Sequence, residues 1–376
     1  MTARTVSIIG GSVSGLGTAL EILKKDPSLA VTIHEKNADC SRYTCAGGIS
    51  SFMLKKLQME VPDFAVAAEI RRLRIYSPNG SCWEAKARNS PYGLVLRRDL
   101  FQLHLAREIQ RLGGKIVTNS YVDRFERNAD IFVAADGLTG STRRLLELPA
   151  PSREDIHLGV QTIARLEEHP KDCISLYFGS VAPDGYAWIF PHEEPGQYRI
   201  GLGVPLNLNL NARELLTDFL FKIEAAPTEI QAKLIPTAKP AAELVHTVRT
   251  ASVLRPKLTV MLVGNAALFC DPATGGGILQ GLLSAKNAAR AICEGRPQNY
   301  EKYCAGLIRT NLFRYKLKQV LCELTDEDFN TLINTMQDFH PDQTSVGRAI
   351  IWALAEIAVK NPRFLMKHRV LRKLLL

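Results

Sequence analysis

The chain has 376 residues, of which 46% are hydrophobic and 23% charged, and its formal net charge is +9 at pH 7. A chain of this length can bury a large core and normally folds into two domains or lobes. It contains no internal repeat or low-complexity stretch. Its eight cysteines lack Cys-x-x-Cys and Cys-x-x-His spacings, which argues against a zinc site or an iron–sulfur cluster.

The first residues predict a strand, a tight turn and a helix. Residues 6–9 are a short apolar run that is typical of a buried parallel strand. The turn at residues 10–15 reads Gly-Gly-Ser-Val-Ser-Gly, in which Gly10, Ser12 and Gly15 would face a dinucleotide pyrophosphate at the helix N-terminus. Ser12 replaces the middle glycine of Gly-x-Gly-x-x-Gly and is small enough to let the pyrophosphate approach.

The second predicted strand, residues 30–34, ends at an acid. Glu35 can accept hydrogen bonds from the ribose of a dinucleotide, and Lys36 follows it. A strand, a helix and a terminal acid in this order predict a dinucleotide site more specifically than the glycines do alone.

A small-residue loop and a helix-start arginine come next. The loop is Cys45-Ala46-Gly47-Gly48, where glycines would let the backbone run close to a ligand. Its thiol is a candidate for chemistry, although a buried structural cysteine has about equal prior odds. Arg98, with Phe101 three residues later, opens a predicted helix; an arginine there is also a common surface charge.

Residues 130–137 predict another buried strand, which ends in Asp136-Gly137. Thirteen residues separate Asp136 from Val122, and they include the charged run at 123–128. We expect this run to form an exposed flank or a partner surface.

Residues 185–191 read Gly-Tyr-Ala-Trp-Ile-Phe-Pro. In an extended segment Tyr186, Trp188 and Phe190 point to one face. Three aromatic side chains on one face form either a packed sheet layer or the wall of an apolar tunnel. Pro191 ends the segment, and Gly-Leu-Gly follows at 201–203.

Residues 262–267 predict a further buried strand, which contains Gly264 and Asn265 and leads into a glycine-rich loop. A helix of small residues then runs through Ala291. The loop and helix start contain Pro272, Gly275, Gly276, Gly277 and Ile278.

The end of the chain is basic and apolar. After Glu356 there are six Lys or Arg residues and no acid. Residues 349–359 predict an apolar helix that is too short to span a bilayer. A basic apolar segment of this kind lies on an anionic membrane surface or docks on the protein body. A nucleic-acid partner is not expected, because the basic residues interleave with leucines rather than with a recognised binding module.

These segments together resemble the geranylgeranyl reductase family of FAD-dependent oxidoreductases, within the aromatic hydroxylase-like superfamily. The resemblance rests on Tyr-x-Trp-x-Phe-Pro with Gly-x-Gly, on the three strand-and-turn blocks, and on the Cys45 loop. Ala46 stands where the family has glycine, and Asn265 where it usually has aspartate. The FAD contacts that the resemblance implies are Gly10, Ser12, Gly15, Glu35, Lys36, Cys45, Ala46, Gly47, Gly48, Arg98, Val122, Asp136, Gly137, Gly264, Asn265, Pro272, Gly275, Gly276, Gly277 and Ile278.

The expected fold class is α/β (α+β overall), with a Rossmann-like FAD-binding domain, an inserted antiparallel β-sheet substrate domain and a helical C-terminal region. The expected boundaries are 1–70, 96–150 and 256–295 for the FAD-binding domain, 71–95 and 151–255 for the substrate domain, and 296–376 for the C-terminal region.

The resemblance implies a reductase that saturates the C=C bonds of an isoprenoid chain by hydride transfer from reduced flavin. Its substrate would be a prenyl lipid or a prenyl diphosphate, and its electron donor NADPH or a ferredoxin. Tyr186, Trp188, Phe190 and Pro191 would bind the chain. The catalytic candidates are Cys45, Tyr186 and Trp188, with Cys45 the first choice as proton donor and Tyr186 the second.

We expect a cytoplasmic protein without a signal or transit peptide, at most peripheral on the inner face of the membrane. Two other classes stay open. One is a flavin monooxygenase or halogenase that acts on an aromatic or polyketide product; halogenases carry Trp-x-Trp-x-Ile-Pro, so Tyr186 and the Cys45 loop favour the reductase. The other is a membrane-docked flavoprotein electron carrier or interaction scaffold.

Overall fold

The computed structural model describes residues 4–125, 129–249, 257–339 and 346–375. Residues 126–128 of the charged run therefore lie outside the described residues. The chain divides into two compact units. Unit 1 comprises Met1–Tyr43, Arg98–Ser152 and Pro236–Arg314, and unit 2 comprises Thr44–Arg97, Arg153–Ile235 and Tyr315–Leu376.

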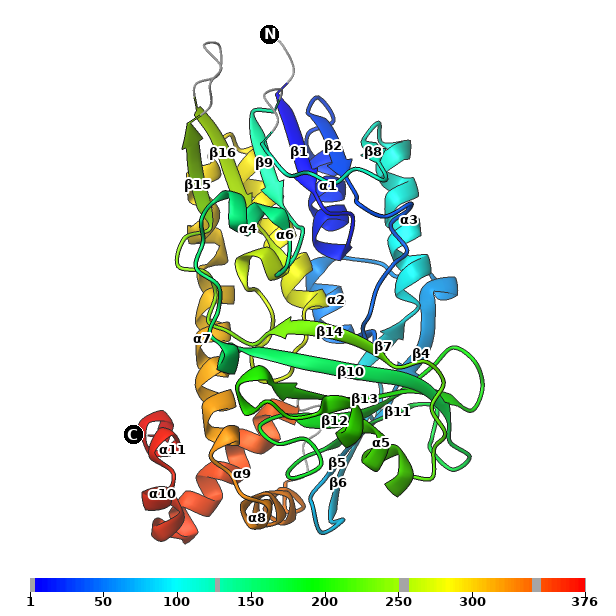
Figure 1. Cartoon of the computed structure of the whole chain (residues 1–376), viewed down its shortest axis with the longest axis vertical. Helices are drawn as coiled ribbons and strands as arrows, with labels where there is room; N and C mark the ends of the chain where they lie inside the picture. Colours follow the sequence, from blue (N-terminus) through cyan, green and yellow to red (C-terminus); the bar gives the residue numbers. More distant parts are fainter. Residues whose placement is uncertain (1–3, 126–128, 250–256, 340–345, 376) are drawn as a thin grey trace. The chain divides into compact units, whose positions relative to one another are not determined.

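Unit 1 is built on a six-stranded sheet in the order β15-β16-β9-β1-β2-β8 (Figure 1). All neighbouring pairs are parallel except β15 with β16. The strands are β1 (Thr5–Ile9), β2 (Ala30–His34), β8 (Lys115–Val117), β9 (Ile131–Ala134), β15 (Val245–Arg249) and β16 (Lys257–Leu262).

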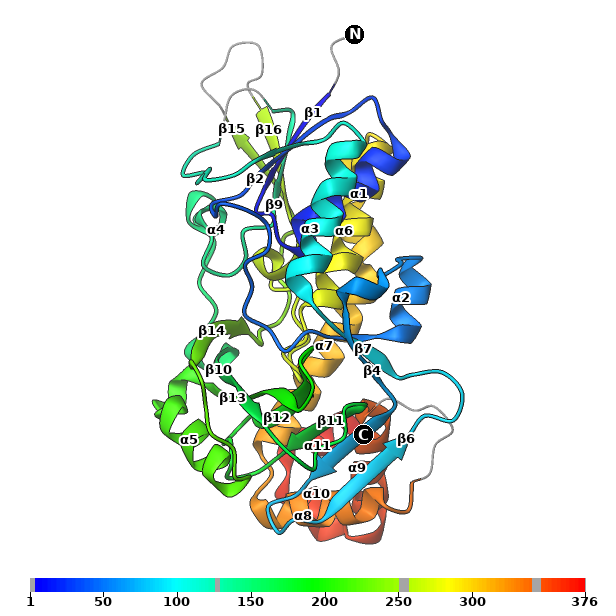
Figure 2. The same cartoon turned by 90° about the vertical axis from the view of Figure 1, so that its right-hand side faces the viewer.

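Helices α1, α3 and α6 run along one face of this sheet (Figure 2). Close packing of α1 on α6 requires small residues, because a Cβ on Gly17 of α1 would lie 3.0 Å from Leu282 of α6. The helices of unit 1 are α1 (Val13–Lys25), α3 (Arg98–Arg111), α4 (Ser141–Leu145), α6 (Ile278–Cys293) and the first part of α7 (Tyr300–Cys322).

Unit 2 contains a seven-stranded sheet in the order β14-β10-β13-β12-β11-β5-β6 and a three-stranded sheet in the order β3-β7-β4. The larger sheet comprises β5 (Arg72–Tyr76), β6 (Cys82–Lys86), β10 (Ile156–Arg165), β11 (Cys173–Tyr177), β12 (Tyr186–Pro191), β13 (Gln197–Pro205) and β14 (Gln231–Pro236). The smaller comprises β3 (Gly48–Ser50), β4 (Val66–Ile70) and β7 (Gly93–Leu96). The helices of unit 2 are α2 (Ser51–Leu57), α5 (Ala212–Lys222), α8 (Asp326–Met336), α9 (Val346–Lys360), α10 (Pro362–Lys367) and α11 (Arg369–Leu375).

The two faces of the seven-stranded sheet differ. Ala187 and Ile189 of β12 belong to a buried cluster with Leu216, Phe219 and Leu220 of α5. Because side chains alternate along a strand, the neighbours Tyr186, Trp188 and Phe190 lie on the opposite face. The predicted one-sided aromatic row is therefore present in β12.

The mixed α/β architecture confirms the predicted fold class, but the units divide the chain differently from the predicted domains. Residues 44–70 belong to unit 2, because β3 and β4 both pair with β7. Residues 236–249 belong to unit 1, because β15 pairs with β16. The strand predicted at 262–267 ends at Leu262, and Gly264–Ala267 forms a 3₁₀ turn instead.

The C-terminal segment docks on unit 2 through specific contacts. Lys367 Nζ lies 2.7 Å from Asp328 Oδ2, and the backbone N–H of Val370 donates to Glu323 Oε2 at 3.1 Å. His368 and Leu371 are almost fully buried. No helix in the described part of the chain is long and apolar enough to cross a membrane.

Two histidines of unit 2 should make its stability depend on pH. Burial lowers the pKa of His157 and that of His169 to about 4, against about 6.5 when unfolded. The unfolded chain then binds more protons between these values, so stability is full above pH 6.5 and falls as the pH drops toward 4. We expect urea unfolding to show a slope of about 1.4 kcal/mol per pH unit for each histidine.

The matched variant is His157→Gln with His169→Gln, which removes both titrating groups and keeps a hydrogen-bonding amide. Its unfolding free energy should fall less steeply over the same pH range, and the slope that remains comes from other groups such as His192, whose pKa is also lowered by burial. An unchanged slope would show that other groups cause the acid sensitivity.

Candidate functional site

The β1–α1 turn of unit 1 is shaped by its glycines. Gly10 has φ +103°, and a Cβ on it would lie 2.6 Å from Ala135 O. A Cβ on Gly15 would lie 1.9 Å from Gly10 O. These glycines are thus required by the packing of the protein itself. Helix α1 has no acid in its first turn, and Ser12 makes no side-chain cap, so its N-terminal N–H groups suit an anion.

Glu35 ties the end of β2 to this turn. Its carboxylate is buried, with Oε2 accepting from Gly11 N at 2.7 Å and Oε1 from Asn37 N at 2.9 Å. Oε1 also accepts from Asn37 Nδ2 at 2.5 Å, so Oε2 keeps the lone pair that can accept from a ribose hydroxyl. Lys36 is exposed beside it.

Arg98, at the start of α3, lies against the same turn. It is 4% exposed, and its Nη2 donates to Ser12 Oγ at 3.1 Å and to Gln102 Oε1 at 2.6 Å. The guanidinium lies over the Tyr43 ring. Among the described residues it has no carboxylate partner, and its Nε has no hydrogen bond. A buried cation of this kind calls for an anion, which a cofactor diphosphate would supply.

A second buried polar group, Asp136, follows the end of strand β9. Asp136 Oδ2 accepts from Thr142 N at 2.9 Å, while its Oδ1 is buried without a hydrogen-bond partner. Burial raises the pKa of this carboxyl. Gly137 has φ +80°, and a Cβ there would meet nothing within 4 Å. Val122 is buried, and its carbonyl accepts from Ser141 Oγ.

The third strand-and-turn segment predicted to contact FAD follows β16. A Cβ on Gly264 would lie 2.2 Å from Ser14 Oγ, so this glycine lets η4 (Gly264–Ala267) approach α1. Gly277 lies beside Asn265, since its Cβ would be 3.3 Å from Asn265 Oδ1. Pro272 and Ile278 are buried on either side of the loop.

Gly276 differs from Gly10, Gly15 and Gly264, which close contacts within the protein require to be glycine. Its φ is not left-handed, and a Cβ would meet only Thr274 Oγ1 at 3.2 Å and Asp271 Cβ at 4.0 Å. The protein's own packing does not demand glycine here. Glycine at this position is compatible with the close approach of a bound group, as expected for a dinucleotide loop.

In unit 2 the register of β12 and β13 explains the Gly-x-Gly of the signature. Trp188 pairs with Gly201, and Tyr186 pairs with Gly203. The indole lies directly on Gly201, where a Cβ would be 2.5 Å from Trp188 Cζ2. The rings of Tyr186 and Trp188 are 5.8 Å apart. Glycine on β13 is therefore what lets the large ring lie flat on the sheet.

The Cys45 loop belongs to this aromatic row. A Cβ on Gly48 would lie 2.7 Å from Phe190 Cε1, and Gly47 (φ +89°) follows a half-buried Cys45. Cys45 Sγ accepts from Gly47 N at 3.4 Å. The sequence analysis assigned this loop to the FAD-binding domain; in the structure it lies in unit 2, because β3 continues from it into the three-stranded sheet.

The structure thus gathers the candidate residues into two groups. The loop residues Cys45, Ala46, Gly47 and Gly48 lie in unit 2 with Tyr186, Trp188, Phe190 and Pro191. All other predicted FAD contacts lie in unit 1.

Sequence reasoning missed several polar residues at both sites. Gln102 accepts a hydrogen bond from Arg98 and also donates to Cys40 O at 2.5 Å; its i+4 spacing from Arg98 was the available signal.

A second missed cluster lies beside the aromatic row. Arg199 of β13 pairs with Phe190 of β12. It is 4% exposed and lies 2.7 Å from Glu193 Oε2. His192 Nε2 lies 3.3 Å from the same oxygen, and burial together with Arg199 lowers the pKa of His192. A lone arginine inside an apolar strand was the signal for that cluster.

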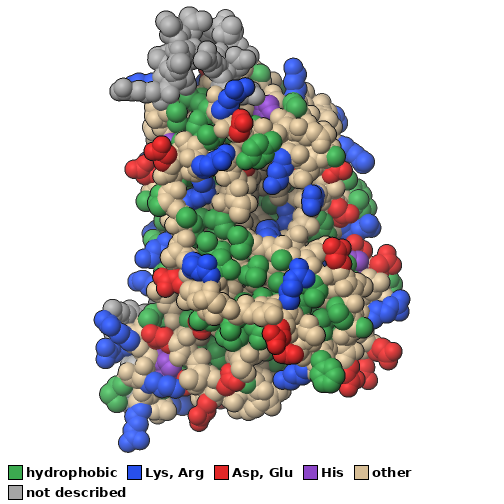
Figure 3. All heavy atoms as spheres, in the orientation of Figure 1, with side chains coloured by type: hydrophobic (Ala, Val, Ile, Leu, Met, Phe, Trp, Pro, Cys, Tyr) green, Lys and Arg blue, Asp and Glu red, His purple; other side chains and the backbone are tan. Residues whose placement is uncertain are grey.

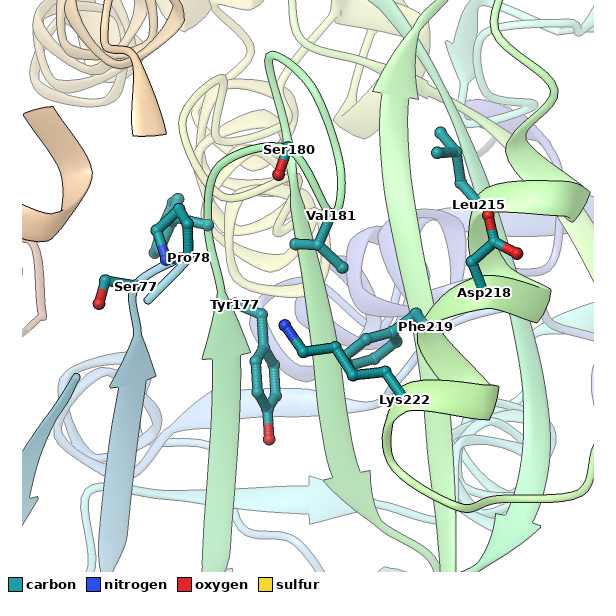
Figure 4. A pocket seen from close by; sticks show the side chains of 10 residues that line it. Ser77, Pro78, Tyr177, Ser180, Val181, Leu215, Asp218, Phe219 and Lys222 are labelled. Carbon is teal, nitrogen blue, oxygen red and sulfur yellow. The ribbon is translucent and has the colours of Figure 1, made fainter. Parts of the chain in front are cut away.

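A cavity of about 240 Å³ lies on the α5 side of the large sheet (Figure 4). Tyr177 and Phe219 line its wall, and Asp218 and Lys222 come from α5. It contains none of the predicted substrate residues, because Trp188 lies on the other face.

No disulfide joins any of the eight cysteines, all of which lie in the described part of the chain. Within the described residues, no group of three or more His, Cys, Asp or Glu side chains could hold a metal ion.

Comparison with known proteins shows which family the chain resembles. Residues 155–237, which include the aromatic row and its glycine partners, match the model of the geranylgeranyl reductase catalytic domain. Digeranylgeranylglycerophospholipid reductase 1 of Methanothermobacter thermautotrophicus is 27% identical, over 98% of both chains. The digeranylgeranylglycerophospholipid reductase of Thermoplasma volcanium is 28% identical, over 95% of this chain and 97% of the relative. The chain is thus similar to the geranylgeranyl reductase family, through the catalytic-domain match and through relatives that align over nearly its whole length.

Solved structures agree on the fold. A geranylgeranyl bacteriochlorophyll reductase-like protein from Thermoplasma acidophilum has a TM-score of 0.85 at 24% identity, covering 98% of this chain and all of the other. The flavin-dependent halogenase CmlS has a TM-score of 0.64 at 18% identity, covering 97% of this chain and 72% of its own. The predicted resemblance, enzyme class and FAD cofactor are confirmed: the chain is an FAD-dependent oxidoreductase that resembles geranylgeranyl reductases.

Proposed function

We propose that the protein saturates carbon–carbon double bonds in the isoprenoid chain of a prenyl lipid. The observation that carries the proposal is the aromatic row of β12, seated on Gly201 and Gly203 and lying beside the Cys45 loop. The relatives are digeranylgeranylglycerophospholipid reductases, which supports a lipid with geranylgeranyl chains as the substrate.

Bound and reduced, FAD supplies a hydride. Its holders would be the unit 1 groups, chiefly the α1 N-terminus, Glu35, Arg98 and the loop at Gly275–Gly277. The buried Arg98 guanidinium, which has no carboxylate partner among the described residues, supports this assignment, as does the lack of any packing demand for glycine at Gly276.

The chain's own residues would hold the alkene and keep water away from it. Tyr186, Trp188 and Phe190 offer an apolar face, with Pro191 at its end. Saturation adds one hydride and one proton across the double bond. Cys45 is the first candidate for the proton donor, with Gly47 N positioned to stabilise the thiolate that remains, and Tyr186 is the second.

The polar end of the substrate is a phosphoglycerol headgroup or a diphosphate, both of which basic side chains would bind. The electron donor would be NADPH or a ferredoxin. Neither assignment is tied to a particular residue of the chain.

The experiment is anaerobic reduction of the FAD-loaded protein with dithionite, followed by incubation with digeranylgeranylglycerophospholipid or geranylgeranyl diphosphate. Mass spectrometry should find products heavier by two hydrogens per reduced bond. Flavin that cycles with no change in any prenyl chain would instead support an electron carrier. NADPH-driven oxygen consumption on addition of aromatic compounds would support a monooxygenase.

The docked C-terminal segment supports a peripheral membrane contact as well. Its buried residues face the protein, whereas Arg363, Arg369, Arg372 and Met366 are exposed. Lys and Arg side chains gather where α10 and α11 lie, at the lower left of Figure 3. A cationic surface with an exposed apolar side chain suits an anionic lipid surface, from which a prenyl lipid would be taken.

Replacing Arg363, Arg369 and Arg372 by Gln should weaken binding to phosphatidylserine vesicles. Each basic residue near an anionic surface contributes about 1 kcal/mol, so the three together predict roughly a 100-fold loss at low salt. Vesicle sedimentation measures it. The control replaces the exposed Arg165, Lys171 and Lys222 of unit 2 by Gln, with the same change in net charge. Equal losses of vesicle binding in both variants would show that net charge alone causes the effect, and not the position of the three C-terminal arginines.

A further inference from the structure

Two residues of α7 bind the segment that leads into the glycine loop of unit 1. Arg314 Nη1 donates to Asp271 Oδ2. Asn311 lies three residues earlier on the same helix face, and its Nδ2 donates to Cys270 O at 3.2 Å. Asn311 and Asp271 are both almost fully buried, whereas the Arg314 side chain is about one-third exposed.

Asp271 in turn organises the loop. Its Oδ1 accepts from Ala273 N at 3.0 Å and from Thr274 N at 3.3 Å. Its backbone closes the turn, because Asp271 N donates to Gly276 O at 3.0 Å and Gly275 N donates to Asp271 O at 2.8 Å. The position of this one residue therefore sets the path of residues 272–277.

The Asp271 carboxylate needs a cation. Burial raises the pKa of Asp271, and Arg314 acts in the opposite direction, as do the amides of Ala273 and Thr274. A carboxylate that is buried without its partner either leaves its site or takes up a proton. In both cases its hydrogen bonds to the two loop amides weaken.

We propose that Arg314 is a positioning residue for FAD: by neutralising Asp271 it holds the loop at 272–277 in the shape that accepts the cofactor. Sequence motifs did not single out this arginine, which lies about forty residues beyond the loop. The inference rests on the proposed assignment of Gly275–Gly277 to FAD, but not on the identity of the prenyl substrate.

The test is titration of the apoprotein with FAD, followed by flavin fluorescence, for a set of matched variants. Arg314→Met should raise the dissociation constant at least about tenfold. Arg309→Met, on an exposed position of the same helix, should change it by less than about twofold. Arg314→Lys keeps the charge and should retain most of the affinity.

A second-site variant distinguishes neutralisation of the Asp271 charge by Arg314 from simple packing of helix α7 against the loop. Asp271→Asn removes the buried charge but keeps an oxygen that accepts from both amides. Added to Arg314→Met, it should restore most of the lost affinity, because no unpaired charge remains. Thermal unfolding of each apoprotein checks that the fold is intact.

The proposal is overturned if Arg314→Met binds FAD like the wild type, if Arg314→Lys is as weak as Arg314→Met, or if Asp271→Asn restores nothing. Failure of the underlying loop assignment looks different. In that case Gly276→Val, which fills the loop itself, would leave FAD affinity unchanged.

Discussion

Trp188→Ala should abolish most reduction of a prenyl chain while the protein keeps its FAD. The indole is 9% exposed, lies on Gly201 and sits next to Tyr186, so its loss leaves a gap in the aromatic face. A double bond held loosely is misplaced, and misplacement of about 1 Å can cost roughly 100-fold in rate. We expect at least that loss in turnover, measured as hydrogens gained by mass spectrometry.

The same substitution should also lower stability, because emptying a buried aromatic site costs about 3–5 kcal/mol. Two variants separate activity from folding. Trp188→Phe keeps an apolar ring and should retain most activity. Ile189→Val changes the opposite face of the same strand and should cost only about 0.5–1.5 kcal/mol, with normal turnover. Full activity in Trp188→Ala would remove the aromatic row from the substrate site.

Gly276→Val should weaken FAD binding about 10- to 100-fold with little change in the apoprotein. The backbone of Gly276 is not left-handed, and its nearest neighbour to an added Cβ is a threonine hydroxyl 3.2 Å away. The protein alone therefore tolerates a side chain, whereas a cofactor that approaches the loop would meet it. Overpacking of about 1–3 kcal/mol converts to the stated change in the dissociation constant.

The measurement is FAD titration of the apoprotein, with circular dichroism and thermal unfolding beside it. The matched control is Gly306→Val on α7, where an added Cβ would meet nothing within 4 Å. That variant should bind FAD normally and be slightly more stable, because glycine is a poor helix former. Normal affinity in Gly276→Val would place FAD away from this loop.

Much of the architecture is readable from local patterns. Residues 30–34 were predicted as a strand and form one with the same bounds, because an apolar run ending in an acid leaves few alternatives. The family was recognisable because Tyr186, Trp188 and Phe190 alternate within a few residues. The prediction for 262–267 failed at its end, since Gly264 (φ +55°) bends the chain out of the extended conformation.

What the sequence by itself determined is therefore local: which segments are strands, where glycines let the chain turn, which side chains share a face, and the family to which they point. These follow from backbone geometry and near-neighbour spacing. Only the tertiary structure decided that the Cys45 loop lies against Phe190 within unit 2 rather than in unit 1, and that Gly201 supports Trp188. It alone brought Arg314 to Asp271 and buried Arg98 with no carboxylate partner among the described residues. Each of these contacts joins residues far apart along the chain, and their pairing depends on how strands and helices pack, which no local pattern encodes.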